Sequence, residues 1–180
     1  MSAVKLKHRE PNGRHKRPTA AERAKRERDA YQVEMRTVLK QPHRRDMPEP
    51  EHPWCATALG RFCLKNRIRR ELHDCAADYA GLVGRWRAAK GVPLADSTGH
   101  AGTGLGPSAA TVRAWEKEID AMEKAMRRAL PGKSGNIAYA AVRHVAVDGA
   151  DLPPEFIPAA AQGMLALAKH MGHRLVHPFV

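Results

Sequence analysis

The chain has 180 residues, 43% of them hydrophobic and 5% aromatic, and a net charge of +12. This length allows one domain with tails or two small helical units, and the scarcity of valine and isoleucine outside short runs argues against a large sheet. The isoelectric point near 10.1 indicates an acidic partner, either nucleic acid or a nucleoprotein complex. There is no run of about 18 apolar residues and no secretory leader pattern, so we expect no membrane partner.

The charge is unevenly distributed along the chain. Residues 1–46 hold 14 Lys and Arg against 6 Asp and Glu, residues 61–90 hold 8 against 3, and residues 134–180 hold 3 against 3. The positive charge therefore lies in the first half, as expected of a basic arm followed by a binding element. The alternative is that the basic residues only keep the protein in solution.

Residues 1–18 predict a basic disordered arm. They lack apolar periodicity and contain the turn signal Pro11-Asn12-Gly13. We expect the arm to become ordered when it binds phosphate groups. Its candidate nucleic-acid-binding residues are Lys5, Lys7, Arg9, Arg14, Lys16 and Arg17.

Residues 19–41 predict a charged peripheral helix, and residues 42–53 predict a proline-rich linker. Thr19 is placed as the N-cap, with Glu22 three residues later to complete a capping box. The first half of this helix has almost no apolar face, which is typical of a solvated helix. Pro42 ends it, and the prolines that follow indicate an extended connection to a helical body at 54–180.

Residues 59–91 form the stretch around which the body is expected to be organised. Apolar residues recur three and four positions apart in its second part, which is typical of one helical face, and Gly91 is placed to end that helix. A shorter helical segment precedes it, and Asn66 between the two is expected to take the left-handed conformation. Two helices joined by about three residues predict a helix-turn-helix.

Basic side chains cluster around this turn. In a helix-turn-helix the N-terminal residues of the second helix contact base edges, and arginine pairs with guanine. The other interpretation is a long antiparallel helical hairpin with a solvated basic face. The candidate nucleic-acid-binding residues of this cluster are Lys65, Arg67, Arg69, Arg70 and His73.

The rest of the body predicts a glycine-rich loop at 92–107 and three further helices. Ser108 caps the first of these helices, the second begins at Ser134, and the third begins near Pro158 and ends at Gly172. Residues 141–147 could instead form a strand, because their valines alternate.

The helix that follows Ser108 carries apolar residues in an a/d pattern over about two and a half heptads. A sustained coiled coil needs about three or four heptads, so we expect an ordinary core helix. Two ion pairs between residues four apart are expected on its exposed side, Asp120 with Lys124 and Glu123 with Arg127.

No catalytic site, cofactor or metal is predicted. No nucleophile, base and acid can be assigned from spacing, and Gly132-Lys133-Ser134 lacks the first glycine of a phosphate-binding loop. A zinc site is the alternative, but no common zinc module has the spacing of its candidate ligands, His52, Cys55, Cys63, His73 and Cys75. Three cysteines without framework spacing indicate a reducing compartment, so we expect a cytoplasmic protein.

Two segments resemble a known class of proteins. The sequence LGRFCLKNRIRRELHDCAADYAGLVGRWRAAKGVP is similar to a pattern in small helical proteins of α-proteobacterial phages and prophages. The segments AVRHVAVDG and MLALAKHMG resemble the C-terminal helix pair of the same class, and a similar ending occurs in regulators of phage-like gene-transfer elements. The resemblance covers about half of the chain and implies a phage-type regulatory role.

The sequence thus predicts an all-α helical bundle with a candidate helix-turn-helix, preceded by the basic arm and the peripheral helix. The expected function is that of a nucleic-acid-binding, phage-type transcription regulator acting on DNA or with RNA polymerase, and not that of an enzyme. Two alternatives stay open. One is a phage DNA-packaging protein, small-terminase-like, or another structural oligomer, and the other is an inhibitor that docks onto a host nucleoprotein complex.

Overall fold

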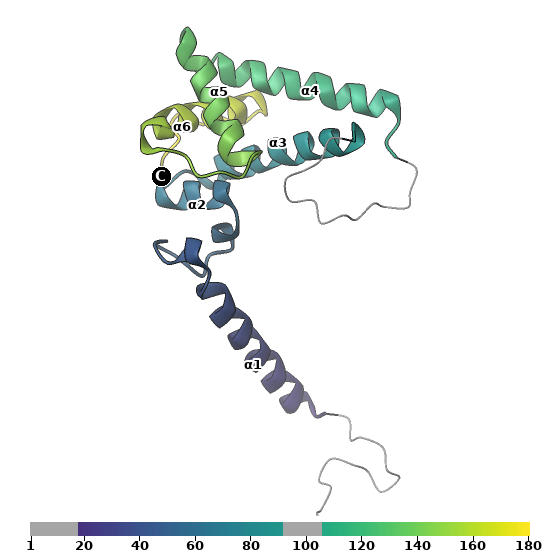
Figure 1. Cartoon of the computed structure of the whole chain (residues 1–180), viewed down its shortest axis with the longest axis vertical. Coiled ribbons are helices and arrows are strands. Elements are labelled where there is room, and N and C mark those ends of the chain that lie inside the picture. The colour runs from purple at the N-terminus through teal and green to yellow at the C-terminus, as the bar shows by residue number, and fades with distance from the viewer. Residues whose placement is uncertain (1–17, 92–105) are drawn as a thin grey trace, which may run out of the picture. The chain divides into compact units, whose positions relative to one another are not determined.

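The computed structural model describes residues 18–91 and 106–180, and the regular structure of these residues is helical (Figure 1). The α-helices are α1 (Ala20–Leu39), α2 (Ala58–Lys65), α3 (Arg70–Ala89), α4 (Ala109–Arg127), α5 (Lys133–Ala146) and α6 (Ile157–His170). Short 3-10 helices are η1 (Pro42–Arg44), η2 (Pro53–Ala56) and η3 (Pro154–Phe156). The predicted all-α fold is confirmed, and residues 141–147 belong to α5 and its C-cap rather than to a strand.

The chain divides into two compact units, residues 1–45 and residues 46–180. The division falls inside the predicted linker, which contains η1 and the start of η2 instead of being extended throughout. Met47 is buried, so packing in the second unit begins before residue 54. Nearly all of the predicted arm and of the glycine-rich loop lies outside the described residues.

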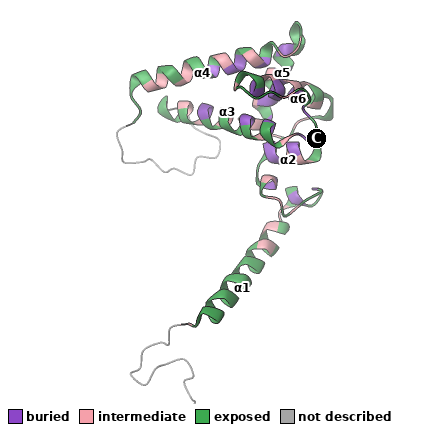
Figure 2. Ribbon diagram, turned by 180° about the vertical axis from the view of Figure 1, so that it is seen from behind, coloured by how far each residue is buried: buried purple, intermediate pink, exposed green. Residues whose placement is uncertain are grey.

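Helix α1 forms as its sequence predicts but buries nothing. The Thr19 hydroxyl accepts a hydrogen bond from the Glu22 N–H at 3.2 Å, and the Glu22 carboxylate accepts one from the Thr19 N–H at 2.8 Å. Lys40 is the C-cap, two residues before Pro42. No residue of α1 is buried (Figure 2). Capping and helix propensity therefore define this helix, because packing contributes almost nothing to it.

Helix α6 lies at the centre of the second unit, in contact with α3, α4 and α5. Half of its residues are buried, namely Ala160, Ala161, Gly163, Met164, Leu165, Leu167 and Ala168. The predicted stop is confirmed, since Gly172 has a φ of 93° just after its C-cap. Within residues 18–91 and 106–180, no helix combines the length and the apolar sequence needed to cross a membrane.

Helix α4 is a core helix, as predicted. Ile119, Met122 and Met126 are buried, and the helix contacts α3, α5 and α6. Trp86 of α3 and Trp115 of α4 are only half-buried and pack at the edge of the core. The centre of the core is therefore filled mainly by aliphatic side chains and by Tyr79, which is fully buried.

The turn between α2 and α3 differs from the prediction in one residue. Arg67, not Asn66, has the positive φ, at 51°. Asn66 is the C-cap of α2, and its side-chain amide donates to the Phe62 carbonyl at 2.8 Å. The N–H of Ile68 reaches back to the Cys63 carbonyl at 2.9 Å, and the Ile68 side chain is buried. This is a Schellman motif, in which the residue after the C-cap must be left-handed so that the next apolar residue can enter the core.

Gly135 allows the start of α5 to approach the backbone at the end of α4 closely. A Cβ at this position would collide with the Arg127 carbonyl oxygen and would lie 2.8 Å from the Leu130 carbonyl oxygen. Both obstacles are backbone atoms, so no rotamer change can relieve the collision. The close approach places α5 side chains within reach of the last turn of α4.

We predict that Gly135→Ala lowers the free energy of unfolding. Overpacking of a well-filled site costs about 1–3 kcal/mol, which exceeds the gain of about 1 kcal/mol that alanine has over glycine inside a helix. Urea-induced unfolding, followed by circular dichroism, measures the difference.

Gly84→Ala in α3 is the matched control, because a Cβ there meets nothing within 4 Å. It should raise the free energy of unfolding by about 0.5–1 kcal/mol through helix propensity alone. Urea midpoints that move in the same direction for both variants would contradict the close contact at Gly135.

Candidate nucleic-acid interface

The five basic residues predicted around the α2–α3 turn do not form one free surface. Lys65, Arg67 and Arg70 are exposed, whereas Arg69 and His73 are half-buried. The six residues predicted in the arm (Lys5, Lys7, Arg9, Arg14, Lys16 and Arg17) lie outside the described residues.

The C-terminal segment of the chain covers one side of this turn. The N–H of Val180 donates to the Arg67 carbonyl at 3.0 Å, and the N–H of Arg69 donates to the Pro178 carbonyl at 3.1 Å. The guanidinium of Arg69 also donates, from Nε to the Phe179 carbonyl, at 3.1 Å. Ile68 and Phe179 form an isolated antiparallel bridge. Arg69 is therefore hydrogen-bonded to the C-terminal segment, and its contact with a base stays a prediction.

His73 is also engaged inside the protein. Its ring stacks on Trp54 of η2 with centroids 3.9 Å apart and planes inclined by 16°. Its Nδ1 lies 2.9 Å from an Asp74 carboxylate oxygen, and the side chain is only 12% exposed. This packing holds η2 against the first turn of α3, and the contact of His73 with a nucleic acid stays a prediction.

Acidic side chains occupy much of the exposed face at the start of α3. Glu71, Asp74 and Asp78 are all exposed, and Asp74 forms an ion pair with Arg70 at 3.5 Å. These carboxylates would repel the phosphates that flank a groove. The α2–α3 pair has the predicted order of a helix-turn-helix, but its charges do not suit the first turns of α3 for reading bases.

The first unit also presents exposed basic side chains. Arg23, Lys25 and Arg26 of α1 are exposed, and none of them forms an ion pair with another described residue. They continue the basic sequence that begins in the predicted arm. These three cations at the start of α1 are therefore available to an external anion.

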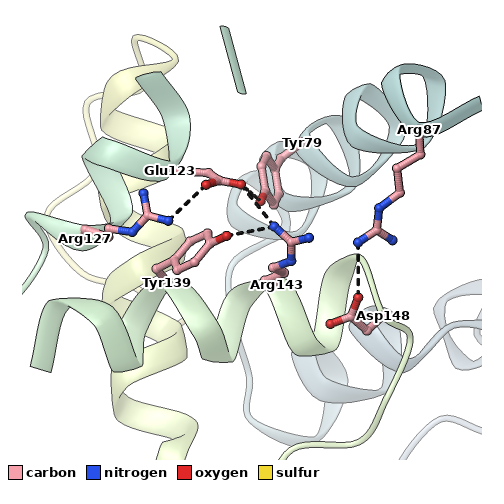
Figure 3. A network of polar contacts seen from close by, with 7 residues as sticks. All are labelled: Tyr79, Arg87, Glu123, Arg127, Tyr139, Arg143 and Asp148. Atoms are coloured by element: carbon pink, nitrogen blue, oxygen red, sulfur yellow. Dashed lines mark hydrogen bonds and ion pairs between the residues drawn. The ribbon is translucent and has the colours of Figure 1, made fainter. Parts of the chain in front are cut away.

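A buried polar network joins α3, α4 and α5 (Figure 3). The Glu123 carboxylate of α4 accepts hydrogen bonds from Tyr79 Oη at 3.2 Å, from Arg127 Nη2 at 3.1 Å and from Arg143 Nη1 at 3.3 Å. Arg143 also donates to Tyr139 Oη at 2.8 Å, and the Arg127 guanidinium lies 4.0 Å above the Tyr139 ring. The sequence prediction of an exposed Glu123–Arg127 pair is therefore correct for the pairing but wrong for the exposure, since Glu123 is only 9% exposed.

Two arginines compensate the buried Glu123 carboxylate, while their own side chains remain 40% and 34% exposed. A carboxylate can be removed from water at low cost only when cations and donors satisfy it in this way. Burial and the neighbouring carboxylate raise the pKa of Tyr79 above its ordinary value of 10.0, so its hydroxyl remains a donor. A further ion pair, Arg87 with Asp148 at 3.7 Å, ties α3 to the end of α5. These contacts hold α3, α4 and α5 together, so the arrangement is typical of a structural polar network.

The three cysteines, Cys55, Cys63 and Cys75, are buried and form no disulfide bond with one another. Burial, with a smaller effect of Asp74, raises the pKa of Cys63 to about 12, which keeps the thiol protonated and unreactive. In the ranges 18–91 and 106–180, no three His, Cys, Asp or Glu side chains come together in a way that could hold a metal ion.

Comparison of the chain with family models, with curated proteins and with solved structures gives no match. Its function is therefore inferred from the charges and contacts of its own residues.

We predict that Tyr79→Phe lowers the free energy of unfolding by about 1.5–3 kcal/mol, the range for a hydrogen bond to a charged group. The ring still fills the core, so the lost contact with Glu123 is the main change. Above pH 10.0 the difference from wild type should shrink, because the unfolded tyrosine then ionises while the folded one stays protonated. Chemical denaturation at neutral and at alkaline pH measures both effects.

Tyr31→Phe is the control for this variant. Tyr31 lies on α1 and is 62% exposed, so its replacement should leave the free energy of unfolding unchanged at either pH. A Tyr79→Phe variant as silent as Tyr31→Phe would show that the Tyr79–Glu123 hydrogen bond does not stabilise the fold.

Proposed function

We propose that this protein binds nucleic acid and that its first unit, residues 1–45, is the main phosphate contact. The main observation behind this proposal is that most of the net charge lies in the unit that contributes no described residue to the hydrophobic core. Residues 1–45 hold 14 Lys and Arg against 5 Asp and Glu, a net charge of +9, whereas residues 46–180 hold 17 against 14, a net charge of +3. None of the described residues of the first unit belongs to the hydrophobic core.

Helix α1 supports the proposal because its composition is not explained by packing. It runs for 20 residues without a buried side chain and with exposed basic residues at its start. A helix of this kind contributes little to the stability of a fold. Its cations can instead neutralise phosphates, a contact that is independent of base sequence and falls steeply with salt.

The biological role that we propose is regulation of transcription, on DNA or together with RNA polymerase. This role is the one that the resemblance of the chain to small helical proteins of phages and prophages implies. The contacts at the start of α3 favour a mode in which charge, and not base readout by a helix-turn-helix, provides most of the affinity.

A second candidate function, docking onto a protein of a host nucleoprotein complex, is favoured by one observation. A groove of about 380 Å³ lies between α5 and the segment around η3, and its lining is almost entirely apolar. Ile137 and Phe156 in this groove are 42% and 36% exposed. Apolar side chains gathered in one exposed groove are typical of a protein-binding surface.

For the main proposal we predict that Arg23→Gln, Lys25→Gln and Arg26→Gln together weaken binding to duplex DNA. The slope of log K against log salt concentration should fall in magnitude by about 2–3, because each lost phosphate contact removes about 0.9. Fluorescence anisotropy of a labelled duplex, measured over a series of KCl concentrations, gives both the affinity and the slope.

The control removes acidic residues from the same helix, as Glu27→Gln, Asp29→Asn and Glu34→Gln, all of them exposed. This variant should bind at least as tightly as wild type with an undiminished slope, because it loses no phosphate contact. The proposal fails if the basic and the acidic variants have the same slope.

The docking candidate makes a separate prediction. Immobilised wild-type protein should retain purified RNA polymerase, and Ile137→Asp should not, because a carboxylate in the apolar groove would be desolvated on binding. Lys133→Gln, on the same helix but outside the lining of the groove, is the control and should retain the polymerase. Equal retention by all three proteins would exclude the groove as the docking surface.

A further inference from the structure

The outward face of α4 carries basic side chains that have no counter-ion among the described residues. With 3.6 residues per turn, these positions fall within an arc of about 60°, on the side opposite the buried face of the helix. All of them are exposed, and none forms an ion pair with a residue in 18–91 or 106–180. They are Arg113, Lys117, Lys124 and Arg128, the last being the C-cap.

Most of the acidic residues of α4 are turned away from this face. Glu116 pairs with Lys90 of α3 at 3.8 Å, and Glu123 is buried in the network with Tyr79. Asp120 is exposed at the border of the arc, but the Asp120–Lys124 pair that the sequence predicted does not form. The face therefore has four basic side chains against one carboxylate.

The positive surface continues onto α6. A groove of about 240 Å³ separates the end of α4 from α6, and Arg128 and Lys169 both line it together with Gln162. Lys169 is exposed and has no ion pair in the described part of the chain. Two cations and an amide thus border one polar groove.

The length of the row suits an extended polyanion. From Arg113 to Arg128 the row covers about 22 Å of helix axis. A DNA strand carries one phosphate per about 3.4 Å of axis, and a duplex is stiff over this length. Like charges four residues apart destabilise a helix when nothing screens them. A straight row of this kind is therefore suited to a partner that brings regularly spaced anions.

We propose that the α4 basic face, defined as Arg113, Lys117, Lys124, Arg128 and Lys169, binds the phosphate backbone of duplex DNA. This inference rests on the proposed function and gives the second unit a nucleic-acid contact of its own. Of these residues, the sequence predicted only Lys124 to lie on the exposed side of its helix, in a pair with Asp120, since periodicity alone does not show which cations lack counter-ions.

The test compares full-length variants that lose equal charge. Lys117→Gln, Lys124→Gln and Arg128→Gln together should reduce the magnitude of the salt slope for a labelled duplex by about 2–3, from about 0.9 for each lost contact. Circular dichroism and the urea midpoint should match wild type, because all three side chains are exposed.

The matched control is Arg85→Gln, Lys133→Gln and Arg174→Gln, which removes three exposed cations from α3, α5 and the segment after α6. It should keep the wild-type slope. An α4 variant with the wild-type slope, or a control variant that loses as much slope as the α4 variant, would overturn the inference.

Two further measurements separate this inference from the proposed function and from a protein partner. The first compares the α4 variant with the variant of α1, Arg23→Gln, Lys25→Gln and Arg26→Gln. If the α1 variant keeps the wild-type salt slope while the α4 variant loses slope, the α4 basic face binds DNA and the first unit is not the main contact. A wild-type protein that binds no duplex overturns both proposals.

The second measurement is a competition. Unlabelled duplex should displace the labelled duplex far better than polyglutamate does, and equal displacement would assign the α4 basic face to an acidic protein instead.

Discussion

Helix α6 has no charged residue before its last two positions, and only Gln162 interrupts its apolar and small residues. Such a helix must be surrounded by protein to be stable. Helices α3, α4 and α5 provide that surrounding, and Gly163 lets α5 approach until the Ala138 carbonyl lies 2.9 Å from where a Cβ would be. The apolar faces of α3, α4 and α5 are buried partly against α6, and α2 packs on α3 and α5. The arrangement of α3, α4 and α5 around α6 follows from this one requirement.

The Glu123 network adds orientation to this apolar packing. Hydrophobic contacts between helices tolerate some sliding, whereas a buried carboxylate is stable only with its donors at hydrogen-bond distance. Tyr79 from α3 and Arg143 from α5 satisfy that requirement only when both helices have one register against α4. Because Gly135 brings α4 and α5 together, Arg127 and Tyr139 can complete the network. The hydrogen bonds of Glu123 therefore fix how α3, α4 and α5 align with one another, while the burial of apolar residues against α6 stabilises their packing.

Charge and folding are largely separated in this molecule. The second unit uses its own ion pairs to join helices, as in Arg87–Asp148 and Lys90–Glu116. The first unit holds most of the net charge and contributes nothing to the core in its described residues. Cations that are not needed for packing can be exchanged between water and phosphate with little effect on stability. This separation is the physical reason for our proposal that α1 contacts an external polyanion.

The sequence by itself determined what depends on neighbouring residues. The capping box at Thr19, the stop at Gly91 with a φ of 69°, and the helical periodicities all follow from contacts within a few residues of the chain. Only the tertiary structure decided that His73 stacks on Trp54 and that Glu123 meets Tyr79, which lies 44 residues away. A charged side chain on the border of a helical face can point to water or to a partner on another helix. The choice depends on which helices pack there, and no local pattern records it.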